Sequence, residues 1–362
     1  MKCAPPFRTL SSCVGSNVSL PTIEQLGLRG AAQNAFHERA ANIAAEQFGR
    51  RVFIRAVVEV SNFCRENCAY CGMRRDNKQL ARFRAHHDQL AELLIHHRPD
   101  SVTDVNIQSG EDPVAVREVV LPLIKTLRRE TSLGISVCLG TLDHNLYAEL
   151  KNAGASIYII KFEIADAATY TAMEAPGKYL ERLAHIRHLA ATGWRVSSGF
   201  IAGLPGQTND DLVANFALAN DLPLDGCSVS PFIPGDETPL AQAPTADINL
   251  TLNSMAALRL MRPDWVIPAV SALNIAEPGA GYIRGLRTGA NLVTINLTPS
   301  DLRDNYLLYK RDRFIMTEER ILNAIAKVGL TASSQSLADF YRAGTKLNGS
   351  SHPKSVETVL AK

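Results

Sequence analysis

Residues 52–71, VFIRAVVEVSNFCRENCAYC, join an apolar run directly to three closely spaced cysteines. The run over 52–60 is strand-like, because apolar and β-branched residues dominate it and no turn residue interrupts it. Cys64, Cys68 and Cys71 follow with the spacing C-x3-C-x2-C, so a short loop can aim all three thiolates at one centre. The stretch therefore predicts a strand that ends in a cysteine loop.

Seven more strand-like runs follow, at residues 102–110, 134–140, 157–164, 195–203, 226–232, 265–270 and 291–297. Segments with the apolar period of a helix lie between them. Several of these segments end in a glycine, as a left-handed helix cap requires: Gly154, Gly193 and Gly289. The chain thus alternates between strand and helix along most of its length.

This alternation starts near Val52 and finishes near Tyr309, and it predicts an α/β fold with parallel strands and right-handed crossovers. Eight such units indicate a complete (β/α)8 TIM barrel with an N-terminal helical extension and a short C-terminal helical extension. A doubly wound open sheet is the alternative, because periodicity does not prove closure. In such a barrel the chemistry lies where strands end and loops begin, so the cysteine loop falls on the functional face.

Five segments are predicted along the chain. Residues 1–19 form a flexible leader, 20–50 N-terminal helices, 51–316 the barrel, 317–342 C-terminal helices and 343–362 a flexible tail. Prolines and polar residues interrupt the leader before any apolar core forms, so it is a poor secretory signal.

The composition favours a cytoplasmic enzyme that acts on small molecules. The 362 residues include 38 Lys plus Arg against 36 Asp plus Glu, for a formal charge of +2. No bulk positive field is therefore available to hold nucleic acid or an anionic membrane, and neither is an expected partner. The sequence also lacks an apolar run long enough to span a bilayer.

The cysteines indicate a reducing compartment. The chain has seven of them, an odd number with three bunched together, which is not the pattern of a disulfide framework. Cys138 and Cys227 stand singly inside apolar strand-like runs. We predict that both are plain core residues, because free cysteine is among the most buried residue types.

Three cysteines are one ligand short of the usual metal sites. A structural zinc would need a fourth ligand, and the nearest histidines, His86 and His87, fall on the following helix outside the usual spacings. Iron–sulfur clusters normally take four cysteines as well. A cluster with one iron left without a protein ligand would have a coordination position open for a substrate or cosubstrate.

These residues, with the aromatic Tyr70 before the last cysteine, resemble the motif of the radical S-adenosylmethionine (SAM) enzymes. The resemblance implies a 4Fe-4S cluster bound by Cys64, Cys68 and Cys71, which are then both its metal ligands and the catalytic residues. It also implies SAM as cosubstrate on the open iron, cleaved by one electron to a 5'-deoxyadenosyl radical. Such a cofactor carries the chemistry while the protein supplies orientation and shielding.

Two further stretches resemble elements that hold SAM in this family. QSGED, residues 108–112, resembles the family's Gly-Gly-Glu element after strand two, which implies that Ser109, Gly110 and Glu111 receive the ammonium group of SAM. The same stretch also suits a capped helix start, with Ser109 or Asp112 as cap and Pro113 at the first position. GFIAGLPGQT, residues 199–208, resembles the element that packs on adenine, and it gives these candidates: Gly199, Ile201 and Gly203.

Two charged residues complete the expected SAM site. Glu163 follows the fourth predicted strand and Arg182 lies on the next helix, and both are candidates for fixing the ribose and the carboxylate of SAM. The alternative is a surface ion pair, which contributes under ~1 kcal/mol and imposes no position in a barrel.

From Val57 to about Tyr309 the chain is similar to the biotin synthase, methylornithine synthase and HydE group, and most of all to the HydE maturases of [FeFe]-hydrogenase. The stretches that carry this are residues 61–84, 107–113, 202–212, 231–241, 288–293 and 297–309. The resemblance implies a small amino-acid-derived ligand inside the barrel. Its predicted contacts are Ser271, Asn274, Thr294, Asn296, Thr298, Arg303 and Tyr306.

The chain departs from the HydE pattern at three places near the expected cavity. Lys161, Phe162 and Glu163 stand where Arg-His-Glu is expected, so the acid is kept and the imidazole is replaced by a phenyl ring. Thr141 and Leu142 replace an expected Glu-Trp pair, and residues 270–271 replace a Thr-Thr pair. These changes are compatible with a HydE-like barrel that processes a different small molecule.

The leading hypothesis is therefore a radical SAM enzyme, either a HydE-like maturase or a relative with an amino-acid-derived substrate. A methylornithine-synthase-like carbon-skeleton mutase is the alternative among enzymes. An iron–sulfur carrier or sensor is the non-enzymatic alternative. The enzymatic hypotheses imply an external electron donor, flavodoxin or ferredoxin, and the maturase hypothesis adds hydrogenase maturation proteins as partners.

Overall fold

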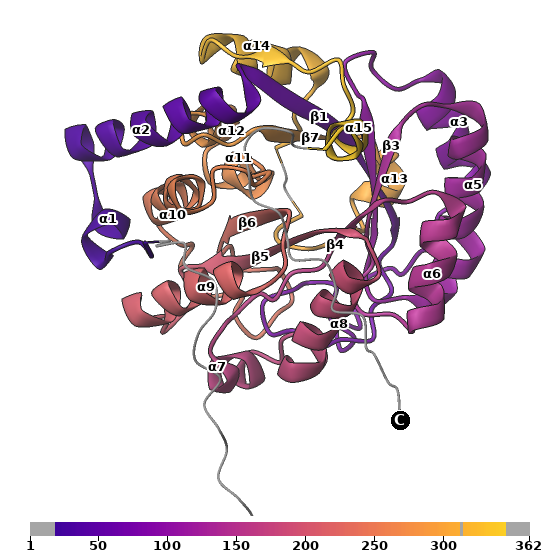
Figure 1. The fold of residues 1–362 in the computed structure, drawn as a ribbon. Coiled ribbons are helices and arrows are strands. Elements are labelled where there is room, and N and C mark those ends of the chain that lie inside the picture. The colour runs from indigo at the N-terminus through magenta and orange to yellow at the C-terminus, as the bar shows by residue number, and fades with distance from the viewer. Residues whose placement is uncertain (1–18, 312–313, 345–362) are drawn as a thin grey trace, which may run out of the picture.

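Parallel β-strands form the centre of the molecule and helices surround them, as Figure 1 shows. The computed structural model describes residues 19–311 and 314–344. Most of the predicted leader and tail, residues 1–18 and 345–362, lies outside the described residues. Within the described residues, no helix combines the length and apolar character needed to cross a membrane.

Seven strands follow one another in a single parallel sheet, in the order β6-β5-β4-β3-β2-β1-β7. Their bounds are β1 (Arg51–Ser61), β2 (Asp104–Ser109), β3 (Gly134–Cys138), β4 (Ile157–Ile159), β5 (Arg195–Ala202), β6 (Gly226–Pro231) and β7 (Leu292–Asn296). The prediction of an α/β fold with parallel strands is confirmed.

The complete eight-stranded barrel is not confirmed, because the predicted strand over 265–270 does not form. Its residues make two isolated parallel bridges instead, Val266 with Gly226 of β6 and Pro268 with Leu292 of β7. Pro268 has no amide hydrogen to donate, which prevents a continuous ladder here. A short β8 (Thr331–Ala332) from the C-terminal region pairs with the first two residues of β1 rather than with β6 or β7.

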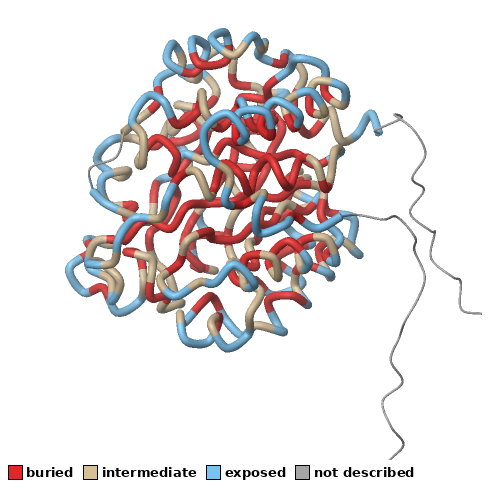
Figure 2. Tube along the Cα trace, turned by 90° about the vertical axis from the view of Figure 1, so that its left-hand side faces the viewer, coloured by how far each residue is buried: buried red, intermediate tan, exposed pale blue. Residues whose placement is uncertain are grey.

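Two groups of helices cover the sheet. Those that connect the strands are α3 (His87–His96), α4 (Pro113–Ala115), the π-helical turn η1 (Val116–Val120), α5 (Leu121–Glu130), α6 (His144–Ala153), α7 (Ala167–Ala172), α8 (Tyr179–Ala191), α9 (Asn209–Asp221), α10 (Ile248–Met261), α11 (Ala272–Ala276), α12 (Gly281–Leu286) and α13 (Ser300–Arg303). Before and after the sheet lie α1 (Ile23–Gly27), α2 (Gly30–Phe48), α14 (Glu318–Lys327) and α15 (Leu337–Arg342). The buried backbone gathers in the middle of the molecule, as Figure 2 shows.

The alternation of side chains along β1 separates the core from the interior of the sheet. One set faces the helices and belongs to the main apolar core: Val52, Ile54, Ala56, Val58 and Val60. The residues between them include Arg55, Val57 and Glu59, which line an internal cavity. Successive residues of a strand point to opposite faces. The two charged residues of this apolar run are therefore the ones that face the interior.

The helix α15 closes the end of the sheet at which the strands begin. The carboxylate of Asp104, the first residue of β2, accepts hydrogen bonds from the backbone amides of Leu337 (2.8 Å) and Ala338 (3.3 Å). The hydroxyl of Tyr341 donates to the carbonyl of Asp225, just before β6, at 3.0 Å. Apolar residues fill the space beneath: Phe48, Phe53, Ile157, Val266, Leu292, Leu337 and Phe340.

Candidate functional site

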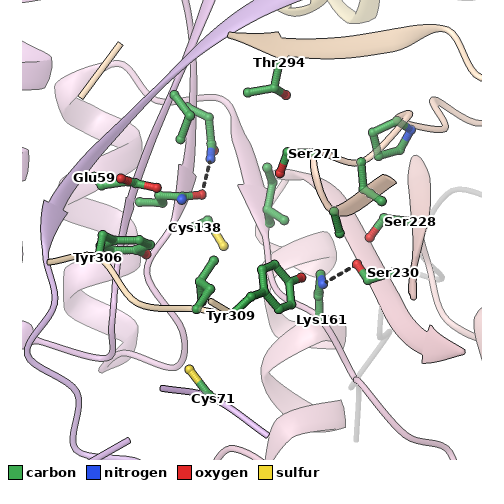
Figure 3. A pocket seen from close by; sticks show the side chains of 18 of the residues that line it. Glu59, Cys71, Cys138, Lys161, Ser228, Ser230, Ser271, Thr294, Tyr306 and Tyr309 are labelled. Carbon is green, nitrogen blue, oxygen red and sulfur yellow. Dashed lines mark hydrogen bonds between the residues drawn. The ribbon is translucent and has the colours of Figure 1, made fainter. Parts of the chain in front are cut away.

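A cavity of about 350 Å³ lies inside the sheet. Cys64, Cys68 and Cys71 line it near the ends of the strands, while Leu337 and Tyr341 line it near α15. Figure 3 shows Cys71 and Thr294 at opposite ends of the view, with Cys138, Lys161 and Tyr309 between them. All three predicted cluster ligands and most of the predicted SAM and ligand contacts thus line one cavity.

The cysteine loop follows β1, and side chains bind its backbone through hydrogen bonds. The guanidinium of Arg82 donates to four backbone carbonyls at 2.5–3.2 Å, those of Asn62, Met73, Arg74 and Asn77. The amide of Asn62 donates to the carbonyls of Ala81 (2.8 Å) and Asn305 (2.7 Å). This anchoring keeps the loop shaped around the three cysteines.

The three thiols need a positive partner before they ionise. Burial raises the pKa of Cys64, Cys68 and Cys71, that of Cys71 to about 12. Metal ligation requires the thiolate, so a bound iron would have to supply the charge that displaces the protons. The three side chains therefore suit the role of metal ligands better than that of free nucleophiles.

Cys64, Cys68 and Cys71 line the same cavity. In residues 19–311 and 314–344, no group of three or more His, Cys, Asp or Glu side chains is arranged to hold a single metal ion. A structural zinc usually has four ligands, whereas a 4Fe-4S cluster on these three thiols would keep one iron without a protein ligand.

The loop after β2 meets the cysteine loop because Gly110 has no side chain. The register pairs Ser61 with Ser109, which brings the ends of β1 and β2 together. A Cβ on Gly110 would lie 2.2 Å from the carbonyl oxygen of Phe63 and 2.8 Å from the Cβ of Cys64. The amide of Glu111 also donates to the sulfur of Cys64 at 3.4 Å. Ser109, Gly110 and Glu111 thus lie directly beside the cysteines.

The carboxylate of Glu111 is buried and held from three sides. Arg182 donates to its Oε1 at 2.8 Å, while Thr141 (2.9 Å) and Arg65 (3.3 Å) donate to its Oε2. Burial opposes ionisation, but the attraction of Arg182 and the bond from Thr141 outweigh it and lower the pKa of Glu111. The backbone amide of Thr141 and the carboxyl group of Glu66 also interact with this carboxylate. The alternative of a surface ion pair is wrong for Arg182, which is 5% exposed.

The start of the next helix matches the capping alternative given for residues 109–113. Asp112 is the N-cap of α4, its carboxylate accepts from the amide of Val114 at 3.2 Å, and Pro113 occupies the first helical position. The helix cap does not exclude the predicted contact with SAM, because Glu111 faces the cavity while Asp112 caps the helix and pairs with Arg84 at 2.7 Å.

Glu163 has a strained backbone and an unsatisfied side chain. Its φ of +64° lies in the left-handed region, which is costly for a residue with a side chain. Its Oε2 has no hydrogen-bond partner, and the nearest cation, Lys161, lies 4.0 Å away. The buried hydroxyl of Tyr70 also lacks a partner. Orphaned polar atoms on the cavity wall indicate that a polar ligand completes it.

The inner part of the cavity is polar as well. The ammonium of Lys161 donates to Ser230 at 3.0 Å, a bond drawn in Figure 3, and the attraction of Glu163 raises its pKa in spite of burial. Arg55 donates to Thr294 at 3.2 Å, and Asn296 donates to Glu59 at 3.0 Å. These polar partners come from β1, β6, β7 and the segment after β4, which are far apart in the sequence.

Most of the predicted site residues line the cavity. The SAM candidates that do so are Tyr70, Ser109, Gly110, Glu111, Glu163, Arg182 and Ile201, and the ligand candidates are Ser271, Asn274, Thr294, Asn296 and Tyr306. Asn274 is 1% exposed, and its Nδ2 has no partner. Twelve of the sixteen non-cysteine candidates therefore reach the same space.

Four predicted residues lie outside the lining of the cavity. A Cβ on Gly199 would lie 2.1 Å from the hydroxyl of Ser228, and one on Gly203 would lie 2.4 Å from the Cβ of Ala246, so both glycines allow close packing of neighbouring segments. The hydroxyl of Thr298 accepts from the amide of Glu59 at 2.9 Å. Arg303 is half-buried at the end of α13, beyond the cavity wall.

Sequence reasoning missed several lining residues. Cys227 is fully buried, as predicted for a core residue, whereas Cys138 is half-buried and lines the cavity, so the core prediction is wrong for Cys138. The others include Arg55, Glu59, Gln108, Ser228, Ser230 and Tyr309. The sequence did contain a signal for these lining residues. Polar residues interrupt the apolar strands, and only the interior of the sheet offers them hydrogen-bond partners.

Comparison with known proteins shows the family to which the chain belongs. A sequence model of the radical SAM superfamily matches residues 58–219, from β1 to α9, which includes the cysteine loop, Glu111, Glu163 and Arg182. The chain is 35% identical over 275 residues to the [FeFe] hydrogenase maturase subunit HydE of Thermotoga maritima, covering 76% of this chain and 78% of that one.

Two further relatives share the fold at lower identity. The 3-methylornithine synthase of Methanosarcina acetivorans is 24% identical over 276 residues, which covers 75% of this chain and 77% of that one. The solved structure of methylornithine synthase (PylB) superimposes with a TM-score of 0.77 at 22% identity, covering 88% of this chain and 94% of that one. This structural likeness bears on the fold alone.

Proposed function

Because this chain belongs to the radical SAM superfamily of enzymes, we propose that it reductively cleaves SAM at a 4Fe-4S cluster held by Cys64, Cys68 and Cys71. When bound, the cluster and SAM would supply a 5'-deoxyadenosyl radical that acts on a small amino-acid-derived ligand in the cavity. The observation that carries the proposal is the cysteine loop, whose three thiols line a cavity together with polar atoms that lack a hydrogen-bond partner.

At the cysteine end, the protein would bind and orient SAM. The negative charge of Glu111 and the backbone at Ser109 and Gly110 suit an ammonium group, and Arg182 fixes the carboxylate of Glu111. The unpartnered Oε2 of Glu163 suits a ribose hydroxyl, since it is an acceptor without a donor. Gly199, Ile201 and Gly203 remain proposed for the adenine, through their backbone, and Tyr70 as the aromatic neighbour of the cluster.

At the inner end, the cavity would hold the second ligand and exclude water. Lys161 offers donors beyond the one used on Ser230, and Asn274 has an unused amide nitrogen. A ligand with a carboxylate or another acceptor group would satisfy both. Ser271, Thr294, Asn296 and Tyr306 add polar walls, and Thr298 and Arg303 stay proposed as supports.

Within the superfamily we favour a HydE-like maturase or a close relative, because similarity to HydE is higher than similarity to methylornithine synthase over an equal share of the chain. The carbon-skeleton mutase remains the second candidate. Membership in a family of enzymes removes the support for a carrier or sensor. An electron donor such as flavodoxin or ferredoxin, and hydrogenase maturation proteins, are the proposed protein partners.

The test is the reductive cleavage of SAM. The full chain is reconstituted with iron and sulfide without oxygen, then mixed with dithionite and SAM, and 5'-deoxyadenosine is measured. Production above background supports the proposal, and none would refute it. Cys68→Ala is expected to abolish both the brown cluster absorbance and the product, whereas the control Cys227→Ser, which changes a core thiol, keeps both.

A further inference from the structure

The hydroxyl of Tyr147, on α6, links the segment after β3 to the helix α8. It accepts a hydrogen bond from the amide of Leu142 at 3.0 Å, and it lies 3.1 Å from Nδ1 of His185 on α8. The side chain of Tyr147 is 1% exposed. A buried hydroxyl with two partners on separate elements holds them at a fixed distance from each other.

Leu142 ends a short segment, residues 140–142, that lies against Glu111. The hydroxyl of Thr141 donates to Oε2 of Glu111 at 2.9 Å, and Arg65 donates to the carbonyl of Thr141 at 2.8 Å. Gly140 has a φ of +70°, and a Cβ there would lie 2.1 Å from the Cγ of Glu111. Displacing this segment would therefore displace the carboxylate.

The helix α8 holds the same carboxylate from the other side. Arg182 bonds to Oε1 of Glu111 at 2.8 Å, and His185, three residues later on the same face, bonds to Tyr147. The contacts form a closed circuit, which runs from Glu111 through residues 141–142, Tyr147 and His185 to Arg182 and back. The circuit fixes both oxygens of one buried carboxylate.

We propose that Tyr147 is a positioning residue, which with His185 fixes residues 140–142 and so sets the orientation of the Glu111 carboxylate at the cysteine end of the cavity. The position of the circuit beside the cysteines is independent of any activity. The further consequence, that the circuit orients the group which receives SAM, rests on the proposed function.

The circuit depends on the protonation state of His185. In the neutral ring, Nδ1 can accept the hydroxyl hydrogen of Tyr147 while the hydroxyl oxygen accepts from Leu142. Protonation turns Nδ1 into a donor, so the hydroxyl hydrogen loses its acceptor. The titratable or charged groups that face His185 are His144 and Tyr147 from α6, His188 and Arg182 from α8, and Glu111 from the loop after β2. Burial lowers the pKa of His185, and His144, Arg182 and His188 lower it further, so the neutral ring is favoured.

The test compares the full chain with Tyr147→Phe, with Tyr179→Phe as a matched control. The hydroxyl of Tyr179 is likewise hydrogen-bonded to the backbone, donating to the carbonyl of Ala165 at 2.6 Å, and Tyr179 does not line the cavity. Hydrogen exchange is measured at the amide of Leu142, and the titration of His185 is followed by NMR. Tyr147→Phe is expected to lower the protection of Leu142 by about tenfold and to raise the pKa of His185, because one hydrogen bond is lost. Tyr179→Phe should change neither.

These measurements need neither cluster nor SAM. Unchanged protection of Leu142 in Tyr147→Phe overturns the proposal. In the reconstituted enzyme, the KM for SAM is expected to rise several-fold in Tyr147→Phe with kcat less affected, and an unaltered KM overturns the step from the circuit to SAM. If the unmodified chain does not bind SAM at all, the proposed function fails while the exchange data still decide the role of Tyr147.

Discussion

Arg182 on α8 and Glu111 after β2 form an ion pair of 2.8 Å in which each side chain is only 6% exposed. Both groups have been taken out of water, so each depends on the other for its charge to remain buried. Arg182 also donates to the carbonyl of Lys161 at 2.9 Å, which ties the pair to the end of β4. The pair thus connects the ends of β2 and β4, which are separated in the sheet by β3.

Removing one partner of this pair should be costly. Arg182→Ala is expected to lower the free energy of unfolding of the metal-free chain by about 3 to 5 kcal/mol, because Glu111 is left as a buried charge with weaker partners. Urea denaturation followed by circular dichroism measures this. Arg187→Ala is the matched control on the same helix, since its ion pair with Asp221 is exposed at 50% and 67% and contributes about 0 to 1 kcal/mol. Equal losses in the two variants would contradict the prediction.

The strain at Glu163 predicts a trade between stability and activity. Glu163→Gly should raise the free energy of unfolding by about 1 kcal/mol, because glycine adopts a φ of +64° without cost, which more than offsets its added chain entropy. It should also abolish the formation of 5'-deoxyadenosine, since the carboxylate is gone.

Glu237→Gly provides the control for that trade. Glu237 has a φ of +57° and is exposed away from the cavity lining. It should gain similar stability and keep full activity. Thermal unfolding of the two metal-free variants, paired with the SAM cleavage assay, separates backbone strain from the carboxylate. A Glu163→Gly enzyme that retains activity would remove Glu163 from the proposed SAM site.

Cys138 and Cys227 should differ in their reaction with a small thiol reagent. Burial raises the pKa of both thiols, so neither is intrinsically reactive, but Cys138 opens onto the cavity while Cys227 is enclosed by the core. In the folded chain, methyl methanethiosulfonate is expected to modify Cys138 at least about ten times faster than Cys227, because access governs the rate of a buried thiol. Peptide mass spectrometry measures both sites in one sample, and equal rates would argue against access through the cavity.

His37 predicts a loss of stability on mild acidification. Burial lowers the pKa of His37 below the ordinary histidine value of about 6.5, and its Nε2 lies 2.9 Å from Oδ1 of Asn253. A lowered pKa in the folded state means that the unfolded chain binds the proton more readily, so stability is complete above about pH 6.5 and falls as the pH drops through the lower folded value. The free energy of unfolding measured between pH 7.5 and about pH 5.5 should decrease, and His37→Gln should make that decrease smaller. An unchanged slope would show that His37 does not contribute to it.

The parts of this protein that the sequence predicted are those set by local pattern. The spacing of Cys64, Cys68 and Cys71 placed them on one loop, and the cap at Asp112 with Pro113 depends on neighbours along the chain. The parts that it missed depend on which face of a strand meets which partner. Cys138 lies in an apolar run that is equally compatible with the core and with a cavity wall. The bond between Lys161 and Ser230 joins the segment after β4 to β6, with three helices and β5 between them in the sequence.

One wrong prediction has a backbone cause. The run over 265–270 has the apolar composition of a strand, but Pro268 interrupts the ladder, so only single bridges form. Thr298 and Arg303 follow β7 as expected but lie outside the cavity lining, and the hydroxyl of Thr298 accepts from the backbone amide of Glu59, so their contact with a ligand stays a prediction.

The position of α15 imposes an order on binding. Because α15 and its aromatic neighbours fill the end at which the strands begin, a ligand reaches Thr294 or Asn274 from the side of the cysteines, as far as residues 19–311 and 314–344 define the route. In the proposed function, a cosubstrate bound beside Glu111 would lie across that route. The inner ligand would then have to arrive first and its product to leave last, so two-substrate kinetics should follow a compulsory sequence rather than random addition.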